Sequence, residues 1–67
     1  MGVLFLTASE LCGKHIGKQI EWQYLGRPVI SDDITMITHK KNGQVLVRYG
    51  RNNRQKTFKP DTEVFIL

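Results

Sequence analysis

Hydrophobic and polar residues alternate over much of the chain after residue 17. Ile20, Trp22 and Tyr24 occupy every second position, and charged or polar residues stand between them. A period of two is typical of a strand with one buried and one exposed face. Residues 18–24 are therefore predicted to form a strand, which ends at the Gly-Arg-Pro sequence of residues 26–28.

Two further strands are predicted on either side of a hairpin turn. Residues 29–39 are extended, with a break at residues 31–33 that indicates a bend, bulge or loop. Asn42 and Gly43 form the strongest hairpin signal of the chain, because both central residues of a type I′ turn need a positive φ. The chain is expected to return in a strand over residues 44–49.

The last part of the chain predicts two more strands. Residues 50–54 are rich in glycine and asparagine, which tolerate the left-handed conformation that turns require. A strand is predicted over residues 55–59, followed by a tight turn of 3₁₀ type at residues 60–62 and a final strand over residues 63–67. The chain is thus expected to contain five short antiparallel strands.

The first 17 residues predict a short helical turn. Thr7 and Glu10 have the spacing of a capping box, in which each side chain is hydrogen-bonded to the backbone N–H of the other residue. Gly13 is expected to stop the helix after one or two turns. A helix this short is expected to lie as a lid over one end of the strands.

Together these elements predict a mainly β fold, a small five-stranded antiparallel SH3-like barrel with a short N-terminal helical turn. Residues 1–67 form one domain in this prediction, with residues 1–17 as the N-terminal segment and residues 18–67 as the barrel. An open meander and an OB-like barrel are the alternatives. An OB fold usually needs a helix between its third and fourth strands, and the turn at residues 50–54 leaves no room for one.

The length of the chain limits the functions that it can have. A domain of 67 residues has a single small core, and a buried catalytic cavity would remove packing that such a core can hardly lose. Cys12 is the only cysteine, so no intrachain disulfide forms, and no Cys/His set has zinc-site spacing. The sequence therefore predicts a protein that is not an enzyme and that needs no metal or cofactor.

Residue types that enzymes use are present but are poorly placed for catalysis. Asp32 and Asp33 are adjacent, so on a strand they would point to opposite faces. Cys12 and His15 are close enough in sequence to form a nucleophile pair, but a buried cysteine with a surface histidine is the favoured interpretation. His39 is interpreted as part of a cationic hairpin tip, together with the lysines that follow it.

Positive charge is concentrated in one part of the chain. The net charge of +4 hides a segment, residues 39–59, with seven Lys or Arg residues and no Asp or Glu. Such a segment attracts nucleic acids, because lysine and arginine neutralise phosphates and release condensed counterions. Its asparagine and tyrosine side chains add hydrogen bonds and a ring that stacks on bases. The expected nucleic-acid-binding residues are Lys40, Lys41, Arg48, Tyr49, Arg51, Asn52, Arg54, Lys56 and Lys59.

The aromatic residues are divided between this surface and the predicted core. Tyr49 is expected to be the exposed residue that stacks on bases. Binding is expected to be directed to phosphates with little base specificity, and DNA is favoured over RNA as the partner. The core is expected to include Ile20, Trp22, Val45, Val47 and Phe58.

Other interpretations of the cations remain open. They can form a solvated surface that suppresses aggregation of exposed strand edges, or they can bind an acidic protein. A protein-interaction or assembly module is the alternative function, with an edge strand or the outer face at Leu46 and Phe65 as its contact surface. Both a monomer and a homodimer are compatible with the apolar residues on both faces of the last strand.

Short motifs of the chain resemble those of a group of small bacterial and phage proteins. The motifs are Thr7-Ala8-x-x-Leu11, His15-Ile16-Gly17-Lys18-x-Ile20 and Asp61-Thr62-Glu63-Val64. This pattern resembles short uncharacterised proteins of actinobacteria and their bacteriophages. The resemblance implies a small barrel in the cytoplasm of a bacterium or of a phage-infected host cell, and it supplies no functional residue.

The N-terminal sequence is consistent with that cytoplasmic location. The apolar run at residues 3–6 is too short for a signal peptide or a transmembrane helix. No basic residue precedes the run, as a signal peptide would require. No membrane association is therefore expected.

Overall fold

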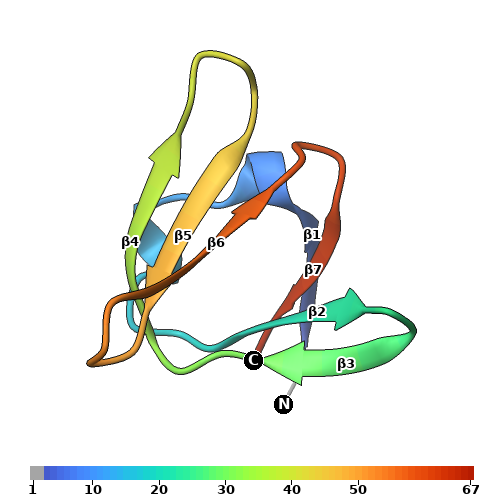
Figure 1. Ribbon diagram of the computed structural model, residues 1–67, viewed down its shortest axis with the longest axis vertical. Helices are drawn as coiled ribbons and strands as arrows, with labels where there is room; N and C mark the ends of the chain where they lie inside the picture. Colours follow the sequence, from blue (N-terminus) through green and yellow to red (C-terminus); the bar gives the residue numbers. More distant parts are fainter. Residues whose placement is uncertain (1–2) are drawn as a thin grey trace.

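The computed structural model describes residues 3–67, which form seven short strands and two single-turn 3₁₀ helices (Figure 1). The helices are η1 (Ala8–Glu10) and η2 (Gly13–His15). A mainly β protein was predicted, and the structure confirms it. The strands are β1 (Leu4–Thr7), β2 (Ile20–Tyr24), β3 (Arg27–Ile30), β4 (Ile34–His39), β5 (Val45–Tyr49), β6 (Arg54–Phe58) and β7 (Glu63–Ile66).

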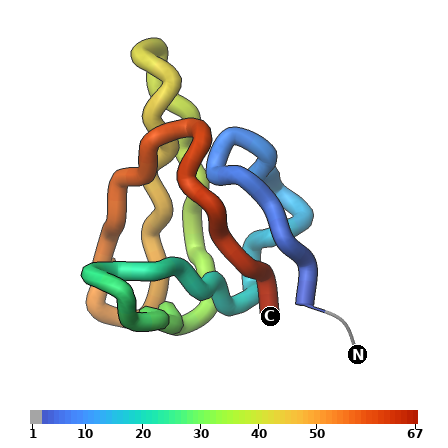
Figure 2. The backbone as a smooth tube through the Cα atoms, turned by 90° about the vertical axis from the view of Figure 1, so that its right-hand side faces the viewer, coloured from blue at the N-terminus to red at the C-terminus, as the bar shows by residue number. Residues whose placement is uncertain are grey.

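The strands form two antiparallel sheets. The first sheet has the order β1-β7-β2-β3, and the second has the order β4-β5-β6. Figure 2 shows β1 beside β7, and the hairpin between β4 and β5 extending beyond the rest of the molecule. No strand pairing joins the two sheets among the described residues, so the strands do not close into the predicted five-stranded barrel.

The core lies between the two sheets and is made by residues at alternate strand positions. Ile20 and Trp22 of β2 pack against Val45 and Val47 of β5 and against Phe58 of β6. Each of the five is at most 5% exposed, which confirms the predicted core. The ring centroids of Trp22 and Phe58 lie 5.3 Å apart in an edge-to-face arrangement, so these two rings link the sheets.

The N-terminal segment contains a strand that the sequence pattern did not predict. β1 pairs with β7 and places Phe5 opposite Phe65. Residues 3–6 are all apolar, so the period-two signal of a strand is absent there. The expected helical lid is reduced to the single turns η1 and η2, and residues 1 and 2 of the expected segment lie outside the described residues.

The Thr7–Glu10 interaction predicted at the start of η1 is present. The Glu10 carboxylate accepts a hydrogen bond from the backbone N–H of Thr7 at 2.9 Å. The Thr7 hydroxyl lies 3.0 Å from the same carboxylate oxygen and donates to it. These bonds, the backbone one foremost, favour the charged form and lower the pKa of Glu10.

The break in the predicted strand over residues 29–39 separates two strands of different sheets. β3 ends at Ile30 in the first sheet, and β4 begins at Ile34 in the second. Ser31 is buried at this crossing, where its hydroxyl accepts from the Ile20 N–H at 3.2 Å and donates to the Asp32 carbonyl at 2.7 Å. The bend that the sequence indicated is therefore a passage from one sheet to the other.

The turn with two positive φ angles lies at a different hairpin from the predicted one. Between β2 and β3, Leu25 and Gly26 have φ angles of 52° and 78°, as a type I′ turn requires. Between β4 and β5, Gly43 has a φ of 90°, and its N–H donates to the Lys40 carbonyl at 3.0 Å. This is the geometry of a type I turn followed by a bulge. The prediction of a hairpin at Asn42-Gly43 is thus confirmed, and its predicted turn type is wrong.

The other two predicted turns lie where the sequence placed them. Gly50 and Asn53 have positive φ angles of 75° and 53° before β6 begins. The Thr62 N–H donates to the Lys59 carbonyl at 3.1 Å and closes a tight turn before β7. This last turn is a single β-turn and not the predicted 3₁₀ turn.

Candidate nucleic-acid interface

The ribbon of β5 and β6 distributes the predicted cations over two faces. The register pairs Tyr49 with Arg54, and Lys56 lies two residues further along β6 on the same face, toward the core. Arg48 pairs with Gln55 on the opposite face. Arg48 does not join Arg54 and Lys56, because neighbouring residues of a strand point to opposite faces.

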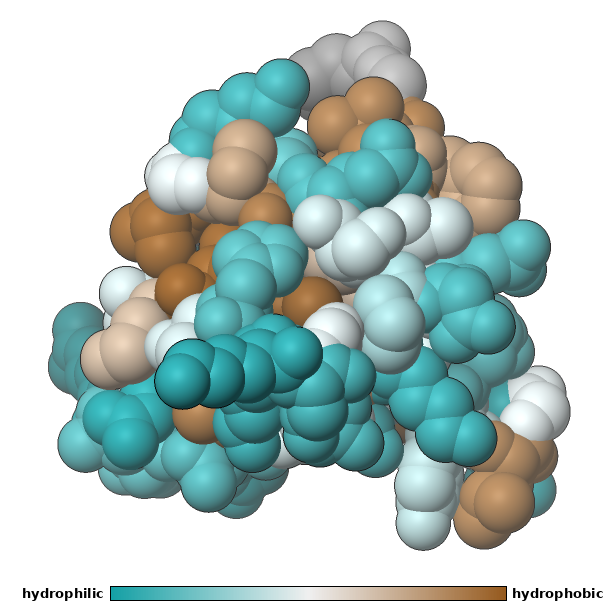
Figure 3. Space-filling view, turned by 90° about the horizontal axis from the view of Figure 1, so that it is seen from above, coloured by the Kyte–Doolittle hydropathy of each residue, from teal (hydrophilic) through white to brown (hydrophobic). Residues whose placement is uncertain are grey.

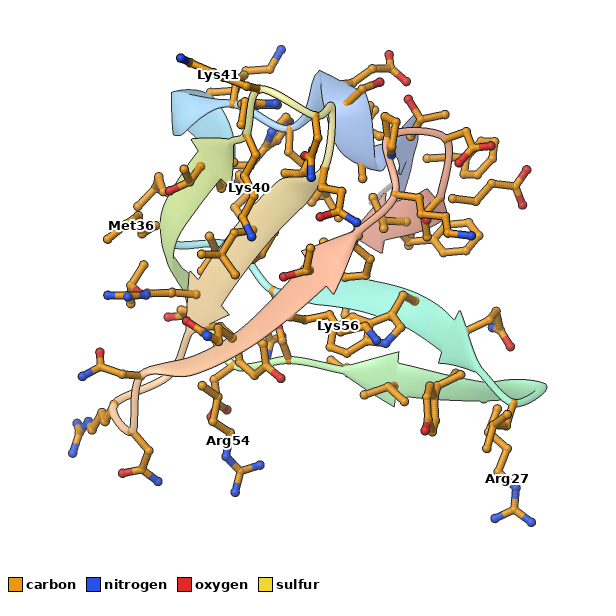
Figure 4. All side chains as sticks on the ribbon, turned by 45° about the horizontal axis from the view of Figure 1, so that its top comes forward. Arg27, Met36, Lys40, Lys41, Arg54 and Lys56 are labelled. Atoms are coloured by element: carbon orange, nitrogen blue, oxygen red, sulfur yellow. The ribbon has the colours of Figure 1, made fainter. Side chains whose placement is uncertain are left out.

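Lys40 and Lys41 lie at the other end of the molecule from Arg54. The lysines belong to the turn between β4 and β5, whereas Arg54 follows the turn at the other end of β5 (Figure 4). A strand of this length spans about 17 Å. The hairpin lysines and Arg54 therefore form separate groups.

Arg51 and Asn52 share a hollow with two carboxylates. The Gly50 N–H donates to the Asp33 carbonyl at 3.1 Å and holds the β5–β6 turn against the β3–β4 crossing. Asp32 and Asp33 thus lie on the same hollow as Arg51, although no acid stands near Arg51 in the sequence. The hollow has a volume of about 620 Å³ and is lined by Asp32, Asp33, Thr35, Gly50, Arg51 and Asn52.

Lys56 and Lys59 flank an opening between the two sheets. Among residues 3–67, β7 pairs with β2 at Ile20 and Glu21 but not further along β2, and β6 pairs with β5 alone. The side between β6 and the end of β2 is therefore open, and aromatic residues of the core form part of its wall. A hollow of about 250 Å³ on this side is lined by Trp22, Gln23, Lys56, Thr57, Phe58, Lys59 and Thr62.

Tyr24 and Arg27 add a ring and a cation that the sequence did not assign to the site. They are cross-strand partners at the end of the β2–β3 ribbon, and Tyr24 is 54% exposed. The Lys56 Nζ lies 5.5 Å from the centroid of the Tyr24 ring, within the range of a cation–π interaction. Arg27 and Arg54 both project on the side away from the β4–β5 turn (Figure 4).

We call the group of Tyr24, Arg27, Arg54, Lys56 and Lys59 the open-side cluster. It combines the end of one ribbon with the edge of the other, and three of its members belong to the predicted site. The prediction placed Arg27 in a turn, whereas it is the first residue of β3. Arg27 and Val29 are two residues apart, as residues on one face of a strand are. This spacing was the signal that could have placed Arg27 on the same face as Tyr24.

Tyr49 lies deeper than predicted. It is half-buried and packs against the core, with its ring centroid 6.1 Å from that of Trp22. Tyr24, on the neighbouring ribbon, presents the more exposed ring. The candidate stacking surface is therefore Tyr24, whereas Tyr49 packs against Trp22.

The structure reverses the predicted exposures of Cys12 and His15. Cys12 is exposed, whereas His15 is 2% exposed. The His15 Nδ1 accepts a hydrogen bond from the Cys12 backbone N–H at 3.0 Å. Burial, and then the charges of Lys14 and Lys18, lower the pKa of His15. The short separation of Cys12 and His15 in the sequence thus allows a hydrogen bond between the Cys12 backbone and the His15 ring.

His39 has a structural contact that the sequence did not indicate. Its Nε2 lies 2.7 Å from the Leu11 carbonyl, to which it donates a hydrogen bond. This bond ties β4 to the N-terminal segment. His39 is therefore engaged with the chain and is not a free member of the cationic tip at Lys40 and Lys41.

Metal and membrane sites receive no support from the described part of the chain. Over residues 3–67, no three His, Cys, Asp or Glu side chains are grouped so that they could hold a metal ion. No helix within the same range is long and apolar enough to cross a membrane.

Comparisons with known proteins assign no family. The sequence matches no protein-family model, and searches of curated proteins and of solved structures find no match. The resemblance to actinobacterial and phage proteins therefore stays a prediction.

Proposed function

We propose that this protein binds nucleic acid, without catalysing a reaction, through the open-side cluster. The observation that carries the proposal is the position of the Lys56 ammonium 5.5 Å from the ring of the exposed Tyr24. Arg27 and Arg54 project on the same side of the molecule (Figure 4). A ring that accepts a base and cations that accept its phosphates thus come from two ribbons of one small domain.

The chemistry of the cluster favours phosphate-directed binding with little base specificity. Its four cations neutralise phosphates and release counterions from the nucleic acid. The Tyr24 ring stacks on any base, because every base has a π face. We propose DNA over RNA as the partner, and an SH3-like arrangement that is open on this side as the scaffold.

The other predicted cations contribute less to binding in this proposal than the open-side cluster does. Lys40 and Lys41 contact only a nucleic acid that is long enough to run along β5 from the open-side cluster. Arg51 contributes less, because it stands beside two carboxylates. Arg48 contributes least because it lies on the opposite face of the ribbon and is partly buried, which makes it a control of equal charge for the exposed Arg54.

A salt titration of DNA binding tests the proposal. Fluorescence anisotropy would follow binding of a labelled DNA of about 20 nucleotides between roughly 50 and 200 mM salt. If four cations each neutralise one phosphate, log K is expected to fall with log salt at a slope of about −3.6 for duplex DNA and about −2.8 for a single strand. Arg54→Gln is expected to reduce the size of the duplex slope by about 0.9, and Arg48→Gln to leave it unchanged.

Two results would contradict the proposal. One is the absence of binding to DNA or RNA at the lowest salt concentration. The other is an equal loss of affinity in Arg48→Gln and Arg54→Gln, because these variants remove the same charge from opposite faces. Tighter binding to an RNA of the same sequence would overturn the choice of DNA alone.

A further inference from the structure

The outer face of the four-stranded sheet carries a continuous row of residues across all four strands. The register places Phe5 opposite Phe65, Phe65 opposite Glu21, and Glu21 opposite Ile30. Residues at the alternate positions, such as Ile20 and Val64, are buried in the core. The row therefore lies on the face that points away from the second sheet.

This row is largely apolar and exposed. Phe5 and Ile30 are 54% and 55% exposed, and Val3, two residues before Phe5 in the chain, is 56% exposed. The rings of Phe5 and Phe65 lie 5.3 Å apart and form one surface. Figure 3, which views the molecule from above, shows brown apolar side chains near the upper edge, and further brown side chains at the left and lower right among teal hydrophilic ones. The predicted surface at Leu46 and Phe65 is corrected, because Leu46 belongs to the other sheet.

The charges on this face all have one sign. Glu21 stands within the apolar row, and Glu63 lies next to Phe65 on the same face. No Lys or Arg occupies an outward-facing position in these four described strands. The outward positions are Phe5 and Thr7 in β1, Glu63 and Phe65 in β7, Glu21 and Gln23 in β2, and Pro28 and Ile30 in β3.

This charge pattern argues against a second copy of the chain as the occupant. In a symmetric dimer the same patch meets itself, so Glu21 and Glu63 of both copies would lie in one interface to which this face contributes no cation. Burying unpaired like charges is strongly unfavourable. A complementary partner needs apolar side chains for the phenylalanines and isoleucine, and Lys or Arg for the two glutamates.

We propose that the outer face of the β1-β7-β2-β3 sheet binds a basic amphipathic helix of a partner protein. A helix packed on one face of a sheet is a standard way to cover its apolar residues. The row from Phe5 to Ile30 crosses three strand spacings, about 14 Å, which matches about nine residues of α-helix. Lys or Arg residues that border the apolar stripe of such a helix would pair with Glu21 and Glu63.

This surface is independent of the open-side cluster. Tyr24 and Arg27 occupy the inward-facing positions of the β2–β3 ribbon, whereas Gln23 and Pro28 occupy the outward-facing ones. The two surfaces therefore lie on opposite faces of the same ribbon. A failure of nucleic-acid binding would therefore not contradict the proposal of helix binding. A failure of helix binding would likewise not contradict the proposal of nucleic-acid binding.

Synthetic helical peptides of 18 or so residues test the proposal. The probe is a Leu/Lys peptide with its leucines on one face, and the controls are the same composition with the leucines scattered and a Leu/Glu peptide with the original pattern. Isothermal titration calorimetry is expected to give at least tenfold tighter binding for the first peptide. Amide shifts in NMR spectra are expected to map to the outward-facing residues of the first sheet.

Variants of the protein locate the contact. Ile30→Ser and Glu21→Lys are each expected to weaken binding of the Leu/Lys peptide at least tenfold, and Glu21→Lys is expected to improve binding of the Leu/Glu peptide. Met36→Ser is the matched control, because Met36 is also exposed, at 42%, but lies on the second sheet (Figure 4). Circular dichroism spectra would establish that each variant is folded.

Three outcomes would overturn the proposal. Similar affinities for the three peptides would show that the face does not select a basic amphipathic helix. An equal effect of Met36→Ser and Ile30→Ser would place the contact elsewhere. A dimer in sedimentation equilibrium that Ile30→Ser dissociates would identify a second copy of the chain as the occupant.

Discussion

At the scale of single residues, His15 shows how a polar side chain is used inside a small core. Its ring is buried, its Nδ1 accepts from the Cys12 N–H, and its Nε2 has no hydrogen-bond partner among the described residues. Because Nδ1 accepts this bond, the proton of the neutral ring is on Nε2. The folded protein therefore favours the uncharged ring.

The lowered pKa of His15 predicts that the protein loses stability as the pH falls below neutrality. The unfolded chain has the ordinary histidine pKa of about 6.5 and binds a proton at a higher pH than the folded protein does. The free energy of unfolding is thus expected to be highest above this value and to fall as the pH decreases toward the lowered pKa. Urea titrations at about pH 7.5 and pH 5.5, followed by circular dichroism, would measure the difference.

His15→Asn tests the assignment of this effect, because asparagine keeps an acceptor near the Cys12 N–H but does not titrate. This variant is expected to lose most of the pH dependence. Replacing Lys14 and Lys18 by glutamine is expected to reduce the dependence only in part, since burial is the larger cause. A His15→Asn variant with the full pH dependence would refute the assignment.

At the scale of elements, the hairpins show that turn geometry depends on more than the favoured turn residues. Asn42-Gly43 has the sequence of a type I′ turn but adopts a longer, bulged loop. Leu25-Gly26 adopts the type I′ geometry with a leucine at a positive φ of 52°. The pairing of Tyr24 with Arg27 fixes a loop of two residues there, so the register of β2 and β3 overrides the preference of leucine.

Leu25→Asn is expected to stabilise the protein by about 1 kcal/mol. Leucine in the left-handed region is strained by its Cβ, whereas asparagine tolerates this conformation and is preferred before glycine in type I′ turns. The Leu25 side chain is 86% exposed, so the substitution removes little packing. Thermal and urea unfolding would give the change in the free energy of unfolding.

Leu25→Ala is the matched control for this prediction. It removes the exposed apolar side chain but keeps a Cβ in the same strained conformation, so little gain is expected. Equal stabilisation by alanine and asparagine would show that exposure of leucine, and not backbone strain, is the cause.

At the scale of the whole molecule, an aromatic group holds together two sheets that no strand pairing joins within the described range, residues 3–67. Trp22 of the first sheet contacts Phe58 and Tyr49 of the second, with centroid distances of 5.3 Å and 6.1 Å. The same arrangement leaves the side beside β6 open, where Lys56 and Tyr24 meet. The packing that holds the sheets together therefore also forms the base of the proposed site.

Trp22→Ala is expected to unfold most of the protein at 25 °C. Removing a buried tryptophan side chain costs about 3–5 kcal/mol, which is about the total that a core of this size supplies. Tyr24→Ala is the control, since Tyr24 lies on the same strand but is exposed, and this variant is expected to stay folded. Far-UV circular dichroism with urea titration measures both, and a cooperative transition near that of the native protein in Trp22→Ala would contradict this account.

Local patterns in the sequence predict much of the strand content, but they predict the candidate nucleic-acid interface only in part. The alternation at Ile20, Trp22 and Val45 predicted residues that are buried, because one face of each strand has to be apolar in water. The sequence pattern did not predict β1, because apolar residues occupy both faces of this strand. Phe5 on its outer face is exposed. The cations of residues 39–59 were visible as a group, but the alternation of the strands divided Arg48 from Arg54.

The sequence by itself determined that this is a small, mainly β protein with a core of alternating apolar residues, a hairpin at Asn42-Gly43 and a basic segment at residues 39–59. These properties depend on residues that are near one another in the chain. The tertiary structure alone decided that Tyr24 and Arg27 join Lys56 and that Asp32 and Asp33 line one hollow with Arg51. It also decided that an apolar face with two glutamates lies across β1, β7, β2 and β3. The order of strands in a sheet is set by contacts between distant residues, and a local pattern carries no record of them.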